Sequence, residues 1–223
     1  MERTIGLIPG TGKQSQGIAK RLGLAGYKVM IGSRTKEKAE RIAAELNEKL
    51  SLTTYHGDEN IEVVKQCDVL FLVLPYEYLY DSLQEFIPHF KPNAIIVDVI
   101  VPLTFKAGNP TCLDDVPEKS VSEYMQSLVP EGVSVVGGFK TISASKLSKI
   151  DSPMNVDVFL TADNKVAKDI ITKIISKIEG LSILDSGPLM YSRTTELMTA
   201  FVINLNKRNK LKHASFRVVS DKH

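Results

Sequence analysis

A glycine-rich stretch near the start of the chain limits its possible folds more than any other segment. A short apolar run, residues 5–8, is followed at once by Gly10, Thr11 and Gly12, and then by an amphipathic segment, residues 16–24. This order predicts a buried strand, a tight turn and a helix. Gly10 allows the turn, and Gly12 allows a ligand to approach the backbone. We therefore expect the diphosphate of a dinucleotide to bind at this helix N-terminus.

The motif is incomplete, so an alternative stays open. Ser15 stands where the third glycine of G-x-G-x-x-G is expected, although serine is small enough for close packing of helix and strand. A tight strand–helix turn without a ligand is the alternative interpretation. The phosphate-binding motif G-x-x-x-x-G-K-[ST] fits less well, because Leu7 and Gln14 replace two of its required residues.

Composition excludes several functional classes. The chain has 223 residues, 43% hydrophobic and 24% charged, with a formal net charge of +2, as in ordinary globular proteins. We therefore expect neither nucleic acid nor a membrane as a partner. The charged first residues lead directly into a strand, so we expect no signal peptide. The two cysteines form no motif and no zinc spacing is present, which favours the cytoplasm and no metal.

The end of the second predicted strand, residues 28–32, indicates which dinucleotide is bound. NAD-binding folds usually have a carboxylate there that accepts from the ribose 2′-OH. Here Ser33 and Arg34 follow the strand, and Lys38 comes one helical turn later. These side chains suit a 2′-phosphate, so the pattern favours NADP over NAD.

The whole pattern predicts an α/β fold. We expect a Rossmann-type, doubly wound, mainly parallel sheet with a smaller C-terminal α/β part that ends in a long helix. The expected domains are residues 1–139, which bind NADP, and residues 140–223. Residues 104–118 read as a loop. The apolar face of the last helix, residues 190–207, favours a homodimer slightly over packing within its own domain.

The fourth predicted strand, residues 68–75, ends where ligands bind in open α/β sheets. Leu74 and Pro75 are therefore candidates to contact the ribose or the nicotinamide. Tyr76 and Tyr78 either line this cleft or pack the next helix. Asp98, within an apolar strand, is either functional or caps a turn.

Several stretches together resemble the family of F420-dependent NADP reductases, which pass hydride between NADP and the deazaflavin coenzyme F420. They cover nearly the whole chain in the family's order. The last one is the most specific, because other Rossmann proteins lack it. The stretches are GTG at 10–12, GIA at 17–19, GY at 26–27, GSR at 32–34, EKAE at 37–40, LP at 74–75, VP at 101–102, TI at 141–142, LDSGPL at 184–189 and SR at 192–193.

The resemblance implies an NADP domain and a smaller C-terminal part, with the two small-molecule substrates facing each other between them. Leu74 and Val101 would lie near the ribose and the nicotinamide, and Thr141 and Ile142 would lie against the deazaflavin. The positions that match the family's NADP site are Thr11, Gly12, Lys13, Gln14, Ser33, Arg34 and Lys38.

Two positions differ from the family pattern on the acceptor side. Lys140 stands where the family commonly has histidine, and Ser143 replaces a proline. Hydride transfer between two cofactors needs alignment and exclusion of water more than side-chain chemistry. We predict that Lys140 stabilises the charge that develops on the reduced acceptor, and that Lys140→Ala lowers turnover without changing NADP affinity.

Three alternatives stay open at this point. An NADPH-dependent imine or carbonyl reductase would need a proton donor, for which Thr141, Lys140 or Tyr78 would have to serve. A flavin or a ferric complex could also replace F420 as the acceptor. A non-catalytic NADP-sensing module would bind NADPH tightly without oxidising it.

Overall fold

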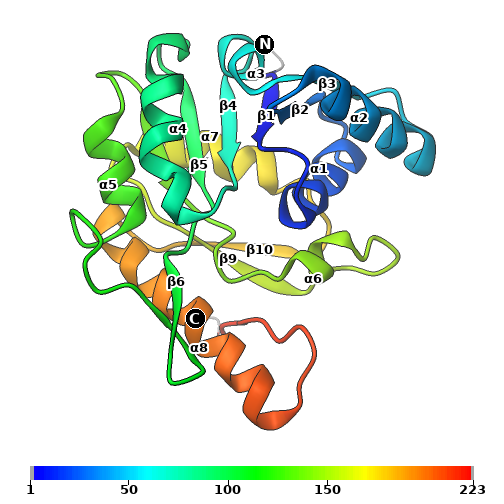
Figure 1. The fold of residues 1–223 in the computed structure, drawn as a ribbon. Coiled ribbons are helices and arrows are strands. Elements are labelled where there is room, and N and C mark those ends of the chain that lie inside the picture. Colours follow the sequence, from blue (N-terminus) through cyan, green and yellow to red (C-terminus); the bar gives the residue numbers. More distant parts are fainter. Residues whose placement is uncertain (1–2, 222–223) are drawn as a thin grey trace.

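The computed structural model describes residues 3–221 and shows six parallel strands in one sheet (Figure 1). The strand order is β3-β2-β1-β4-β5-β8. These strands are Ile5–Ile8 (β1), Val29–Ser33 (β2), Tyr55–Glu59 (β3), Val69–Leu72 (β4), Ile95–Asp98 (β5) and Ser134–Gly137 (β8). The order reverses between β1 and β4, which is where ligands bind in folds of this type. The predicted Rossmann-type fold is therefore confirmed.

Helices cover both faces of the sheet, as its fully buried central strands require. On one face, α1 (Lys13–Leu24), α2 (Lys36–Leu50) and α7 (Lys165–Ile175) share one apolar cluster with the sheet. On the other face, the second cluster includes α3 (Asn60–Gln66), α4 (Leu79–Phe86) and α5 (Val121–Leu128). Ser120 accepts from the backbone N–H of Glu123 and so caps the first turn of α5.

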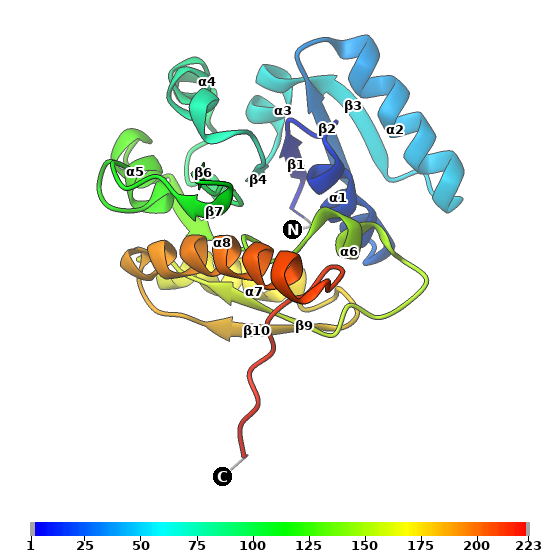
Figure 2. The same cartoon turned by 60° about the horizontal axis from the view of Figure 1, so that its bottom comes forward.

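The C-terminal part adds a second, smaller sheet. The parallel pair β9 (Val156–Leu160) and β10 (Leu181–Asp185) lies below the main sheet, beside the long helix α8 (Ser192–Asn209) (Figures 1 and 2). The first apolar cluster includes residues of α1, β9 and α7, so one hydrophobic core contains residues from both sides of the predicted boundary at position 140. The division into residues 1–139 and 140–223 stays a prediction.

Residues 104–118 were expected to form a loop, and part of this expectation is wrong. Strands β6 (Leu103–Lys106) and β7 (Asn109–Cys112) pair as an antiparallel hairpin. Its two-residue turn has positive φ angles of 48° at Ala107 and 74° at Gly108. Paired positive φ angles match the right-handed twist of two strands, and an Ala-Gly turn is a weaker signal for this than Asn-Gly.

The short helix α6 (Ala144–Ser148) packs directly on α1. A Cβ atom on Gly17 of α1 would lie 2.6 Å from the Cβ atom of Leu147. Real Cβ atoms do not approach this closely, so only glycine permits the observed spacing of these two helices. The contact places the chain after β8 below the start of α1.

Candidate dinucleotide site

The glycine-rich turn joins β1 to α1 and has the geometry expected from the sequence. A Cβ atom on Gly10 would lie 2.7 Å from Cγ2 of Ile31, so glycine lets the turn rest on β2. At Gly12, a Cβ atom would meet nothing closer than Ser15 Oγ at 3.8 Å. No side chain caps the first turn of α1, which leaves its backbone N–H groups available to an anion.

A cavity of about 370 Å³ opens beside this turn. It lies at the carboxyl ends of β1, β2 and β4, where the strand order reverses. Its lining residues are Ile8, Pro9, Thr11, Ser33, Arg34, Lys38, Asn60, Leu74, Pro75, Tyr78, Ser82 and Phe86. The structure thus brings together six residues that the sequence assigned to cofactor binding: Thr11, Ser33, Arg34, Lys38, Leu74 and Pro75.

The cavity carries positive charge and hydrogen-bond donors without a lining carboxylate. Arg34 and Lys38 are exposed, and the hydroxyl of Ser33 comes from the buried end of β2. Within residues 3–221, neither Arg34 nor Lys38 forms an ion pair. A phosphate group would supply the missing counter-charge.

Asn60 also lines this cavity, although no sequence motif singles it out. Its Oδ1 atom is buried and has no hydrogen-bond partner in the described part of the chain. This atom lies beside β2, because a Cβ atom on Gly32 would be 2.7 Å from it. A buried polar group without a partner costs free energy, which a hydrogen bond from a ligand would recover. The donors, the open turn and Asn60 together fit the adenosine end of NADP.

The predicted acceptor residues lie on the chain that leaves β8. Thr141 and Ile142 are both buried, and neither lines the cavity. The side-chain amide of Gln14 donates to the carbonyl oxygen of Ile142 at 2.9 Å. This bond joins the first turn of α1 to the predicted acceptor segment. Val101, half-buried, follows β5 at the same edge of the sheet.

Lys140 points into the protein. Its Nζ atom lies 2.6 Å from Asp98 Oδ2, 2.6 Å from the carbonyl oxygen of Ile100 and 3.5 Å from Glu196 Oε1. Its side chain is 1% exposed. Two buried carboxylates attract the ammonium inward, because an unpaired charge there would be costly. The direct contact with an acceptor that we predicted would therefore require Lys140 to leave these partners.

Asp98 and Glu196 link Lys140 to other parts of the fold. Asp98 accepts from Ser122 Oγ at 2.6 Å and from the backbone N–H of Ile100 at 2.8 Å, so it does cap the turn after β5. Glu196, on α8, accepts from the backbone N–H of Val121 at 2.9 Å. Burial raises the pKa of Glu196, and the nearby ammonium of Lys140 opposes that rise. The cluster therefore fixes β5, α5 and α8 around the backbone of Lys140.

Comparison with known proteins identifies relatives of this chain. Residues 4–102 match the family model described as "NADP oxidoreductase coenzyme F420-dependent". The F420-dependent NADP reductase of Methanocaldococcus jannaschii is 34% identical, over 97% of this chain and 98% of the relative. The enzyme of the same name from Methanothermobacter marburgensis is 32% identical, over the same shares of the two chains.

A solved structure supports the fold. The protein from Arthrobacter sp. FB24, whose description names an F420-dependent NADP reductase, superposes with a TM-score of 0.79. The match covers 99% of this chain and 100% of that protein, at 21% sequence identity.

Proposed function

The chain belongs to the family of F420-dependent NADP reductases, and we infer that it catalyses hydride transfer between NADP(H) and coenzyme F420. The observation that carries this inference is the cavity at the end of β2, where Ser33, Arg34 and Lys38 converge without a lining carboxylate. When bound, the nicotinamide of NADP(H) supplies or accepts the hydride. This chain's residues bind and align the two substrates.

We propose roles for the residues of the site. The backbone of Gly10, Thr11 and Gly12 holds the diphosphate, and Lys13 and Gln14 continue this binding surface into α1. Ser33, Arg34 and Lys38 hold the 2′-phosphate, and the unpaired Oδ1 atom of Asn60 accepts a hydrogen bond from the adenosine.

The nicotinamide half lies at the other end of the site in this proposal. Leu74, Pro75 and Val101 border the ribose and the nicotinamide, and exclude water from them. Thr141 and Ile142 place the deazaflavin, with their backbone anchored by Gln14. Lys140 acts through this backbone, because its ammonium is held by Asp98.

Mixing the protein with NADPH and oxidised F420 tests the function directly. We expect loss of deazaflavin absorbance at a catalytic rate, with one NADPH consumed for each F420 reduced. Activity with a flavin, a ferric complex, an imine or a carbonyl compound in place of F420 would redirect the assignment. Tight NADPH binding without turnover by any acceptor would indicate an NADP-sensing module instead.

We further propose that the protein is a cytoplasmic homodimer. Both cysteines are buried free thiols, and thiols stay reduced in the cytoplasm. In the described chain, no helix is both long enough and apolar enough to cross a bilayer. Leu197 and Phe201 of α8 are 44% and 54% exposed, and an apolar pair on one helix face suits a second copy. Light scattering of the wild type and of Phe201→Glu tests this, since the variant should be monomeric.

A further inference from the structure

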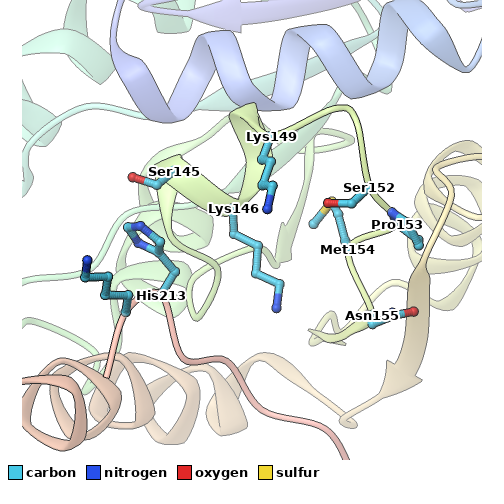
Figure 3. Close-up of a pocket in the computed structure, with 9 residues that line it drawn as sticks. Ser145, Lys146, Lys149, Ser152, Pro153, Met154, Asn155 and His213 are labelled. Carbon is cyan, nitrogen blue, oxygen red and sulfur yellow. The ribbon is translucent and has the colours of Figure 1, made fainter. Parts of the chain in front are cut away.

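A second cavity, of about 300 Å³, shares no lining residue with the β2 cavity and begins at Ser145, in the helix that follows Ile142 (Figure 3). Three stretches of chain meet around it: α6 with the residue after it, the loop at 152–155, and the turn after α8. Figure 3 shows Lys146 and Lys149 extending into the space between Asn155 and His213. The lining residues are Ser145, Lys146, Lys149, Ser152, Pro153, Met154, Asn155, Lys212 and His213.

The charge of this cavity is one-sided. Its lining contains three lysines and a histidine, but no aspartate or glutamate. None of these lysines has a carboxylate within ion-pairing distance among residues 3–221, whereas Lys36, Lys65, Lys91, Lys106, Lys140, Lys165 and Lys168 do. The Nζ atom of Lys146 lies 3.2 Å from the hydroxyl of Ser215, a neutral partner. Unpaired cations around a concave surface produce a positive potential that attracts anions.

Hydrogen bonds from α1 hold two of the stretches that line the cavity, α6 with Lys149 and the loop at 152–155. Arg21, from α1, donates to the carbonyl oxygens of Leu147, Lys149 and Ser152. These bonds fix the chain on both sides of Lys149. Because Arg21 is buried, the backbone around Lys149 is ordered before any ligand binds.

The turn that carries Lys212 and His213 is also anchored. Asn206 of α8 accepts from the backbone N–H of Leu211 through its carbonyl oxygen and from that of Ala214 through its side chain. Further along, Asp157 of β9 accepts from the backbone N–H of Val218 at 2.5 Å. The cations from two distant stretches are thus brought to one cavity by the fold.

We propose that this cavity binds the phosphate and carboxylate groups of the hydride acceptor. The proposal rests on the proposed function, because coenzyme F420 carries a phosphodiester and glutamate carboxylates in a flexible tail on its deazaflavin. The cavity begins at Ser145, three residues after Ile142, so ring and tail would be held by one continuous segment. Lysine ammonium groups suit both phosphate and carboxylate oxygens.

The test compares F420 with its tail-less deazaflavin in wild type and two triple variants. The cavity variant carries Lys146→Gln, Lys149→Gln and Lys212→Gln. The control carries Lys49→Gln, Lys106→Gln and Lys173→Gln, which removes the same charge from exposed positions elsewhere. We expect the KM for F420 to rise about tenfold or more in the cavity variant only. The KM values for tail-less deazaflavin and for NADPH should not change.

A titration with pyrophosphate tests whether the cavity binds anions at all, independently of whether the anion belongs to F420. If pyrophosphate bound saturably to wild type but not to the cavity variant, while the KM for F420 was unchanged, the cavity would bind a free anion and the assignment to F420 would be overturned. Equal effects in both variants, or no saturable binding together with an unchanged KM, would overturn the proposal. Wild type that reduces neither deazaflavin would refute the proposed function, and the titration would still decide whether the cavity binds anions.

Discussion

The Nζ atom of Lys140 lies 2.6 Å from Oδ2 of Asp98, and both side chains are at most 1% exposed. The pair joins the chain after β8 to the end of β5, beside the predicted acceptor segment. Lys140→Ala would leave two buried carboxylates without their cation, so we expect a loss of about 3 kcal/mol in the free energy of unfolding. Urea denaturation measures this loss.

The matched control for that prediction is Lys165→Ala. Lys165 also contacts a carboxylate, that of Asp169 at 2.8 Å, but this pair is on the surface. We expect a change below about 0.5 kcal/mol there. If the two variants were equally stable, the buried pair would not have the structural importance that we assign to it.

Recognition of the 2′-phosphate gives a second prediction. Arg34→Ala should raise the KM for NADPH about tenfold and leave that for NADH unchanged, because NADH lacks the phosphate. Lys36→Ala is the control, because Lys36 is an exposed cation two residues further along, at the start of α2, and does not line the cavity. An equal loss with both cofactors would place Arg34 elsewhere in the site.

A third prediction concerns the two buried oxygens that lack a partner, Asn60 Oδ1 and Thr54 Oγ1. Replacing either residue by an apolar one of similar size should leave the stability of the free protein unchanged or higher. Asn60→Leu should also weaken NADPH binding about tenfold, as measured by calorimetry. Thr54→Val should not, because Thr54 does not line the cavity. Similar NADPH affinities for both variants would contradict a role for Asn60.

The pKa of Glu196 gives a prediction about pH. Burial raises this pKa above its ordinary value of 4.5. Between pH 4.5 and the raised pKa, Glu196 therefore keeps its proton in the folded protein but loses it in the unfolded chain. The resulting stabilisation is present below pH 4.5 and is lost as the pH rises toward the folded-state pKa. The unfolding free energy of wild type minus that of Glu196→Gln should therefore fall as the pH rises from 4.5. A difference that rises with pH would show that the pKa is lowered.

The sequence predicted the main sheet because local patterns determine it. Short apolar runs alternate with amphipathic segments, and both glycine and the basic residues stand at strand ends, where their spacing is informative. The ends of elements are less clear from the sequence: α4 ends at Phe86, and the next residues, which include Pro88, form a short 3-10 turn. The order of elements was therefore more predictable than their exact ends.

Other features depend on contacts between distant residues. Lys140 and Glu196 are 56 positions apart in the sequence, and nothing near either residue indicates that they meet. The unpaired Oδ1 atom of Asn60 becomes informative only when β3 is placed beside β2. The cationic cavity likewise needs Lys146 and Lys212 to be brought together. A single sequence shows the residues but not these pairings.

The absence of a side chain at Gly17 has a mechanical result. With nothing between the backbone of α1 and Leu147, the helix that begins at the dinucleotide turn and the one that follows the acceptor segment cannot slide independently. If the two substrates bind where we propose, this contact sets the gap that the hydride crosses. In that case the reaction distance is built in at folding, before either substrate arrives.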